Sequence, residues 1–222
     1  MRDEFHPPVE EYLETIGFLA EEGAPVIQAR LAQWLDKSAP AVSEMLDRLE
    51  SAGYITRSGR EIALTTEGRR QSESVIRKHR LAERLLVDVI GLPWRDVHLE
   101  AGRLEHVISD DVAERLVQLL GDPATCPHGN PIPGSSNAAP DPSIQVSMAD
   151  IAPGQVIRLQ RLTEELELDA ASLAYLDDAG FIPGTAAVVQ ARAPDGTLVI
   201  QIEGGTLALG PQLCQRLFVV VA

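Results

Sequence analysis

The chain has 222 residues, of which 45% are hydrophobic and 23% charged, and this composition excludes wholesale disorder. The formal net charge of −14 argues at first sight against nucleic-acid binding, which needs positive surface to displace counterions from phosphates. Two cysteines far apart in the sequence, and no segment near the roughly 18 apolar residues of a membrane span, exclude a disulfide scaffold and a membrane partner, so we expect a cytoplasmic protein.

Residues 1–73 have the pattern of a winged helix-turn-helix DNA-binding domain. Hydrophobic periodicity predicts, in chain order, helices over 9–20, 29–35 and 40–52, then a hairpin formed by 54–57 and 61–64. Ser38 is a suitable N-cap for the third helix, with Pro40 in its first turn. Two short helices joined by a tight turn and followed by a hairpin are typical of this DNA-binding unit.

Residues 74–134 are predicted to form a helical dimerisation and metal-binding domain. One long helical pattern covers 66–90, a second covers 94–108, and a third covers 110–120 with Ser109 as its N-cap. These helices carry more apolar surface than a winged helix needs. The surplus suggests a homodimer interface, or alternatively an internal helical core, built from Leu85, Val89, Leu104, Val107 and Leu116.

A segment rich in Pro, Ser, Gly and Asn follows and predicts a linker over 135–145. Beyond it, residues 146–222 alternate between apolar and polar side chains. The predicted strands lie near 156–160, 187–191, 198–202 and 218–221, with one helix over 169–180. This pattern is typical of a small β-barrel of the SH3 size class, so the whole chain is predicted to be mainly α with a C-terminal β domain.

The third helix and its flanks carry the candidate DNA contacts. Small side chains at a helix start can enter a major groove, and flanking arginines can hold phosphates, although small residues there can also simply form a cap. The candidates are Gln28, Arg30, Ser38, Pro40, Ala41, Ser43, Glu44, Arg48 and Arg60. Residues 48–80 hold eight Lys or Arg against four Asp or Glu, so the net charge indicates weak non-specific affinity rather than excluding DNA.

Candidate metal ligands concentrate in the helical domain, where four of the five histidines lie within 79–128. Spacings of three and four residues place pairs of side chains on one helix face, and a Cys and a His in a Pro/Gly loop have no core to fill. The pairs are Glu11 with Glu14, His79 with Glu83, His98 with Glu105 and His106, and Cys126 with His128. Alone, the His79–Glu83 and Glu105–His106 pairs are better explained by surface hydrogen bonds, and Glu11 with Glu14 by solvation. The Cys126–His128 pair is the stronger signal, and the clustering of all these residues favours a metal site.

The sequence resembles the diphtheria toxin repressor family of metal-dependent transcriptional regulators, which includes iron and manganese sensors. The run 77–110 and the Gly-Asn-Pro-Ile-Pro-Gly loop are together highly specific, and the likeness covers essentially the whole chain. The last domain looks like the SH3-like (FeoA-type) module of longer members. The matching segments are 11–16, 38–43, 77–86, 97–98, 104–110 and 129–134.

The resemblance implies a homodimer that binds palindromic operator DNA when two metal ions occupy each subunit. A regulatory site between the first helix and the dimerisation helices would draw on Glu11, Glu14, Glu105 and His106. His79 matches a ligand of that site in manganese-type members. An ancillary site would draw on His79, Glu83 and His98. Cys126 and His128 from the nearby loop would join it, with Asp169 as a carboxylate from the SH3-like domain.

Gly102 departs from the family pattern, because iron-type members have a thiol ligand there and manganese-type members a carboxylate. A glycine supplies only its carbonyl, or room for water. Glu11 likewise stands where iron-type members have a thioether, so the regulatory site has no sulfur and its oxygen-rich ligands favour Mn(II), with Fe(II) as the alternative. Zn(II) and Co(II) are expected to bind in vitro, and the Cys126 ligand suits Zn(II) or Fe(II).

We therefore predict a Mn(II)-responsive regulator of metal-homeostasis genes, with no enzymatic activity and no small organic ligand. An Fe(II)-dependent regulator of iron uptake genes is the first alternative. A metal-dependent hydrolase using Glu105 and His106 has no nucleophile motif or Gly-rich phosphate loop to support it. A metal-independent winged-helix protein whose C-terminal barrel binds a partner is the remaining alternative.

Overall fold

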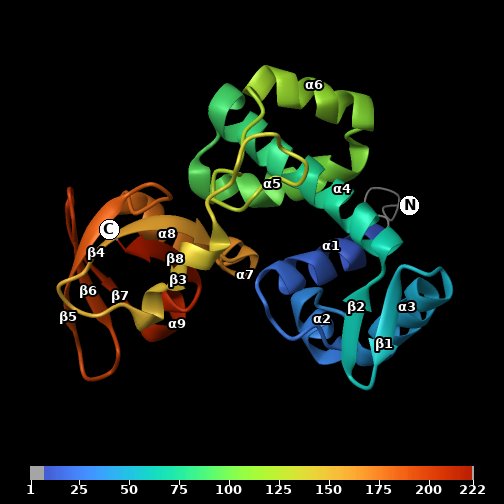
Figure 1. The fold of residues 1–222 in the computed structure, drawn as a ribbon, viewed down its shortest axis with the longest axis horizontal. Coiled ribbons are helices and arrows are strands. Elements are labelled where there is room, and N and C mark those ends of the chain that lie inside the picture. Colours follow the sequence, from blue (N-terminus) through green and yellow to red (C-terminus); the bar gives the residue numbers. More distant parts are fainter. Residues whose placement is uncertain (1–7, 222) are drawn as a thin grey trace.

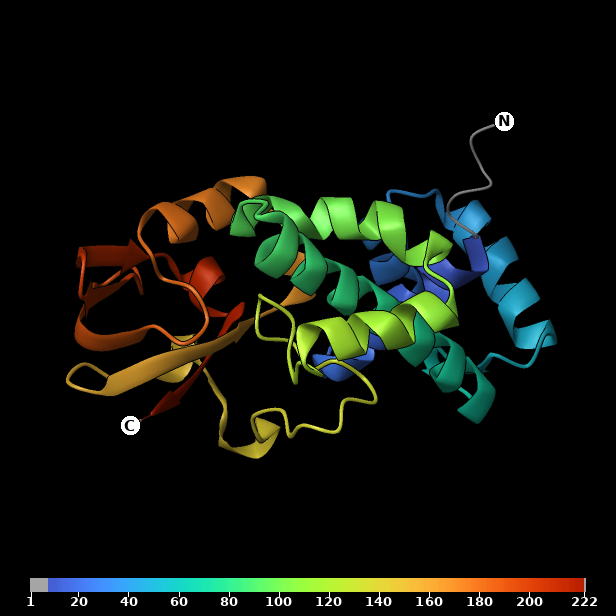
Figure 2. The same cartoon turned by 90° about the horizontal axis from the view of Figure 1, so that it is seen from above.

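The computed structural model describes residues 8–221. Figure 1 shows three units, with the sheet domain and the winged helix at opposite ends and the helical domain between them. Figure 2 shows how elongated this arrangement is when seen from above. The predicted fold class is confirmed: a winged helix and a helical unit precede an antiparallel sheet. No helix within the described part of the chain is long and apolar enough to cross a membrane.

The winged helix forms as its sequence pattern predicts. Its elements are α1 (Pro8–Glu21), α2 (Gln28–Trp34), α3 (Ala39–Ser51), β1 (Ile55–Ser58) and β2 (Glu61–Leu64). The Ser38 hydroxyl accepts a hydrogen bond from the backbone N–H of Ala41 at 3.4 Å, so it caps α3. The buried face of α3 consists of Val42, Met45, Leu46 and Leu49. These side chains pack against α1, which leaves the first turn of α3 exposed to solvent.

One continuous helix joins the winged helix to the helical domain. α4 (Thr66–Arg84) continues into a π-helical segment, Leu85–Ile90, and the expected boundary after residue 73 falls inside α4. The predicted second helix is divided into a 3-10 turn at Trp94–Asp96, α5 (Val97–Leu104) and a second 3-10 turn at Glu105–Val107. The third helix, α6 (Asp110–Leu120), is capped by Ser109 as expected.

The apolar surplus of this domain is partly internal. Leu116 is buried with Leu81 and Ala113, and Leu85 and Leu104 pack at the margins of the same helical cores. Val89 and Val107, in contrast, are 55% and 56% exposed. Both alternatives raised by the sequence therefore apply, because some of these side chains fill the core and others form an exposed apolar surface. Ile90, Leu99, Val112 and Leu119 of the same domain are also exposed.

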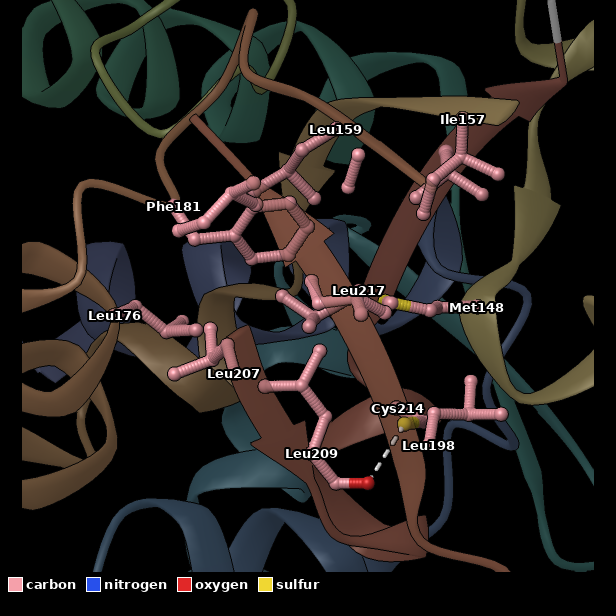
Figure 3. Close-up of a cluster of buried hydrophobic side chains, with 14 of the residues drawn as sticks. Met148, Ile157, Leu159, Leu176, Phe181, Leu198, Leu207, Leu209, Cys214 and Leu217 are labelled. Carbon is pink, nitrogen blue, oxygen red and sulfur yellow. Dashed lines mark hydrogen bonds between the residues drawn. The ribbon is translucent and has the colours of Figure 1, made fainter. Parts of the chain in front are cut away.

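The C-terminal domain is a six-stranded antiparallel sheet with the order β3-β8-β4-β5-β6-β7. The strands are β3 (Val146–Ser147), β4 (Val156–Leu162), β5 (Ala186–Arg192), β6 (Leu198–Ile202), β7 (Gly205–Leu209) and β8 (Leu217–Val221). Figure 3 shows its core, where Met148, Ile157 and Phe181 are buried between the strands. The helices are α7 (Glu164–Glu167), α8 (Ala170–Asp178) and α9 (Pro211–Cys214), and neither α7, α9 nor β7 was expected from the sequence.

Candidate metal centres

Helices α4 and α5 bring three of the predicted ligands together. His79 and Glu83 lie one turn apart on α4, with His79 Nε2 3.3 Å from Glu83 Oε1. His98 reaches them from α5, because its Nδ1 lies 3.1 Å from His79 Nε2 and 3.3 Å from Glu83 Oε1. All three side chains are buried. Spacings near 3 Å between nitrogen and oxygen donors are those of ligands around one divalent ion.

The sheet domain adds two glutamates to this group. Glu167 Oε2 lies 3.0 Å from His98 Nδ1, and Glu164 Oε2 lies 3.9 Å from the same nitrogen. Both come from α7, a single turn capped by Thr163, and both are buried. The sequence analysis did not identify them. One sequence signal could have found them: Thr163 is an N-cap, and two glutamates three residues apart after it lie on the same face of a helix.

The structure does not place Asp169 in this group. Its carboxylate caps α8 and accepts hydrogen bonds from the Ser172 N–H at 3.1 Å and the Ser172 hydroxyl at 2.8 Å. Its other charged neighbour is Arg216, at 3.9 Å. The carboxylates that reach the ligand group from this domain are therefore Glu164 and Glu167, because α7 and not the start of α8 faces α4.

The loop between α6 and the linker adds Cys126 and His128. Cys126, His128 and Glu83 have ligand atoms within 4.8 Å of one another, and all three side chains are buried. Gly129 allows this approach, because its φ is +91° and a Cβ there would overlap the carbonyl oxygen of Gln160 in β4. The loop is thus pressed against the sheet domain. This places both side chains beside α4, as the sequence suggested.

A second ligand group joins the winged helix to the helical domain. Glu14 of α1, His79 of α4 and Glu105 after α5 are buried and have ligand atoms within 4.8 Å of one another. His79 Nδ1 is paired with Glu105 Oε2 and lies 4.0 Å from Glu14 Oε1. One imidazole, through its two nitrogens, therefore faces both groups.

His106 and Glu11 lie at the margins of this second group. His106 Nε2 is 3.0 Å from Glu105 Oε1, and its Nδ1 is 2.8 Å from Glu10 Oε2, a partner the sequence analysis did not identify. Glu11 lines a cavity of about 350 Å³ together with Glu14, Gly102 and Glu105. A Cβ at Gly102 would meet no atom within 4 Å, so the cavity has open space on this side.

Both ligand groups bring buried carboxylates and imidazoles close together, and this shifts their pKa values. Burial and the neighbouring carboxylate of Glu105 raise the pKa of Glu14 to about 8. Burial alone would raise the pKa of Glu105, but the charge of His79 and the hydrogen bond with His106 lower it to about 2. Burial would lower the pKa of His98, but hydrogen bonds with Glu167 and Glu83 raise it to about 9. Protonated imidazoles thus balance buried carboxylates, and a divalent cation could replace those protons.

The candidate DNA contacts divide into exposed and occupied side chains. Exposed side chains lie on α3, at its N-cap and on the hairpin: Ser38, Pro40, Ala41, Glu44, Arg48 and Arg60, with Ser43 half-buried. Gln28 is used within the domain, because its amide donates to the Ala39 carbonyl at 2.9 Å. Arg30 points toward the sheet domain and lies 3.4 Å from Glu165. In this arrangement Arg30 forms an ion pair with Glu165, whereas the sequence analysis predicted that it would contact a DNA phosphate.

Three family models match consecutive parts of the chain. Residues 4–62 match the N-terminal DNA binding domain of iron dependent repressors, and residues 65–134 match their metal binding and dimerisation domain. Residues 146–221 match the FeoA domain. Together these models cover both candidate metal centres and the helix-turn-helix.

Curated relatives match over nearly the full length of the chain. The iron-dependent repressor IdeR of Mycobacterium leprae is 44% identical over 204 residues, which are 88% of this chain and 88% of that protein. The diphtheria toxin repressor of Corynebacterium glutamicum is 42% identical over 207 residues, 90% of each. These relatives are transcriptional repressors and not enzymes.

Solved structures agree with the fold at similar coverage. A manganese-dependent transcriptional repressor in complex with manganese superposes with a TM-score of 0.86 at 30% identity, covering 96% of this chain and 100% of that one. ScaR with bound Zn²⁺ superposes with a TM-score of 0.79 at 27% identity, covering 96% and 99%.

Proposed function

We propose a function from the premise that this chain belongs to the diphtheria toxin repressor family of metal-dependent transcriptional regulators. It acts as a homodimer that binds palindromic operator DNA when loaded with metal and so controls metal-homeostasis genes. The observation that carries this proposal is that Glu14 of α1 and Glu105 after α5 converge, buried, on His79. A cation held there would link the DNA-binding domain directly to the dimerisation domain.

The regulatory site is assigned to Glu11, Glu14, Glu105 and His106, with His79 as the residue that joins them. Its donors are carboxylate oxygens and imidazole nitrogens, with Gly102 contributing at most its carbonyl or room for water. Such a set suits Mn(II), and Fe(II) is the alternative. The support is divided, because the 44% identical relative is an iron-dependent repressor whereas the structure with a TM-score of 0.86 is a manganese-dependent one.

The ancillary site is assigned to His79, Glu83 and His98, with Cys126 and His128 from the loop after α6, giving two ions per subunit. Glu164 and Glu167 supply the carboxylates that the sequence analysis sought at Asp169. These two glutamates belong to the sheet domain, so a cation at this site would tie that domain to α4. Divalent metal supplies positive charge at both sites, where it offsets buried carboxylates.

Without a cation, burial and, after it, repulsion from the neighbouring carboxylate of Glu105 raise the pKa of Glu14 to about 8. Offsetting that repulsion favours the arrangement in which α1 stays against α4. In the dimer, the exposed apolar surface around Val89 and Val107 faces the partner subunit. The two α3 helices then stand about one DNA turn apart, roughly 34–36 Å, and enter successive major grooves.

The test is operator binding by Glu105→Ala and His106→Ala proteins during a Mn(II) titration. Coupling between metal and DNA of about 1–3 kcal/mol predicts a shift of roughly 5- to 150-fold in the Mn(II) dependence. Glu100→Ala is the matched control, because Glu100 lies on the exposed face of α5 and pairs only with the neighbouring Arg103 among the described residues. Operator binding by both site variants that matches the control would refute the proposal. Repeating the titration with Fe(II), Zn(II) and Co(II) compares the metals.

A further inference from the structure

We infer that the sheet domain competes with DNA for Arg30, because the carboxylate of Glu165 holds the guanidinium that would otherwise bind a phosphate. The contact restrains DNA binding within each subunit. The inference rests on the proposed function, since it requires operator binding. Neither residue belongs to a metal-ligand group in the described part of the chain.

Arg30 lies at the start of α2, the first helix of the helix-turn-helix. The Gln28 amide donates to the Ala39 carbonyl at 2.9 Å, so the starts of α2 and α3 are side by side. Gln28 and Ala39 also line a cavity together with Arg60 of the hairpin. In helix-turn-helix proteins the first helix crosses the DNA backbone, and arginines there bind phosphates. Arg30 therefore lies at the edge of the surface that faces DNA.

The ion pair of Arg30 joins the winged helix to the sheet domain. Arg30 Nη2 lies 3.4 Å from Glu165 Oε2, and Arg30 makes no other ion pair within residues 8–221. The two side chains are 36% and 35% exposed. An ion pair that water and salt reach from both sides is weak, so a DNA phosphate is able to displace Glu165.

Glu165 is positioned by its own domain. Its other carboxylate oxygen, Oε1, accepts a hydrogen bond from Arg216 at 3.2 Å. Arg216 precedes β8, and its carbonyl accepts the Thr163 N–H at 2.9 Å, which fixes the N-cap of α7 next to that strand. A carboxylate held in this way loses little conformational freedom when it binds Arg30. The sheet domain thus presents Glu165 as a preformed acceptor.

A second contact with the winged helix keeps α7 close to Arg30. Glu22, which follows α1, accepts a hydrogen bond from the Glu164 backbone N–H, with 2.8 Å between Oε1 and N. Glu164 immediately precedes Glu165, so this bond holds Glu165 near the DNA-binding domain. Groups that are tethered in this way meet at a high effective concentration. An individually weak ion pair can therefore compete with DNA.

A cavity of about 450 Å³ beside the ion pair gives Arg30 room to move. Trp34, Leu168 and Arg216 line it together with Arg30 and Glu165. Because the guanidinium borders open space, it can leave Glu165 by rotation of its side chain. Glu165 then keeps Arg216 as its partner, so no carboxylate is left without a cation. The opening that DNA binding requires therefore costs little.

Operator binding by the full-length Glu165→Gln protein at saturating Mn(II) tests the inference. We expect binding about two- to fivefold tighter than that of the wild type at low salt, which corresponds to the loss of one exposed ion pair. The gain should shrink as salt is added, because exposed charges are screened. Glu203→Gln is the matched control, since it removes an exposed carboxylate from the turn between β6 and β7 of the same domain. This control should bind like the wild type.

Arg30→Gln separates competition for Arg30 from a general effect of charge. If Glu165 acts by holding Arg30, Glu165→Gln should give no gain in the Arg30→Gln background, and the double-mutant cycle measures this coupling. No gain of Glu165→Gln over the Glu203→Gln control, or an equal gain with and without Arg30, would overturn the inference. The proposed function is judged separately, from whether operator binding by the wild type depends on Mn(II).

Discussion

Arg80 donates a hydrogen bond to Glu164 of the sheet domain, with 2.6 Å between Nη2 and Oε1, and its side chain is almost completely buried. The same guanidinium donates to Glu21 at the end of α1, at 2.6 Å, and to the Pro131 carbonyl before the linker. A single buried cation therefore holds together the DNA-binding domain, α4 and the sheet domain, through charge-assisted hydrogen bonds.

Replacing Arg80 should destabilise the protein strongly. Arg80→Met leaves Glu164 buried without its cation, and breaking a buried pair costs about 3–5 kcal/mol. Urea unfolding measures this as a fall in the free energy of unfolding. Arg70→Met removes an exposed pair with Glu67 on the same helix and should leave the midpoint nearly unchanged. Equal midpoints for the two variants would show that Arg80 does not tie the domains together.

Gly102 is expected to accept a carboxylate side chain. Its Cβ position is open, and it lines the same cavity as Glu14 and Glu105. Gly102→Glu adds an oxygen ligand to the regulatory site, so the apparent Mn(II) affinity should rise about tenfold, equivalent to about 1.4 kcal/mol. Mn(II) titration followed by electron paramagnetic resonance of the free ion measures it. Gly204→Glu adds the same charge at an exposed turn and serves as the control; no gain over that control contradicts the assignment.

Substitutions of Asp169 and Glu167 should have different effects, the first on stability and the second on metal binding. Asp169→Ala removes the cap of α8 and should lower the free energy of unfolding by about 1 kcal/mol while leaving metal affinity unchanged. Glu167→Gln should weaken metal binding instead. Calorimetric titration of Zn(II) and urea unfolding of both variants decide between them. A weaker Zn(II) affinity in Asp169→Ala would return Asp169 to the ligand set.

The stabilisation by Asp169 should also depend on pH. Hydrogen bonds from Ser172 lower the pKa of this carboxyl below its ordinary value of 3.8. A lowered pKa in the folded protein means that the ionised cap stabilises above the unfolded pKa, and that the gain disappears as pH falls through the folded value. The difference in unfolding free energy between wild type and Asp169→Ala should therefore be constant at neutral pH and vanish in acid.

Gly129 should tolerate substitution much less well than Gly154. Both residues have a φ of +91°, but a Cβ at Gly154 meets nothing within 4 Å, whereas one at Gly129 overlaps the Gln160 backbone. Gly154→Ala should cost about 1–2 kcal/mol from backbone strain alone. Gly129→Ala should cost about 1–3 kcal/mol more and increase proteolysis of the linker, because the loop must leave the sheet domain. Similar unfolding free energies for the two variants would contradict this account.

The sequence predicts best what depends on one helix at a time. His79 and Glu83 are spaced by one helical turn, and their side chains do meet in the structure. The contribution of Glu167 could not be derived in this way. α7 has only four residues, too short for a periodic signal, and its approach to α4 depends on how two domains dock.

The sequence also does not determine which face of a helix is buried. Glu10, Glu11 and Glu14 are equally acidic in the sequence, and only the packing of α1 buries Glu14 and turns Glu10 toward His106. In the same way, Leu116 and Val107 are both apolar, but only Leu116 has a neighbouring helix to cover it within one subunit. Tertiary contacts decide such cases.

The chain contains two tryptophans, and each lies beside a different candidate metal centre. Trp34 lines the cavity that holds Glu14 and Glu105, and the Trp94 ring lies 4.7 Å from the ring of His128. The unlabelled protein therefore carries an optical probe for each centre. With Trp34→Phe and Trp94→Phe variants, the order in which the two centres fill can be followed by intrinsic fluorescence alone.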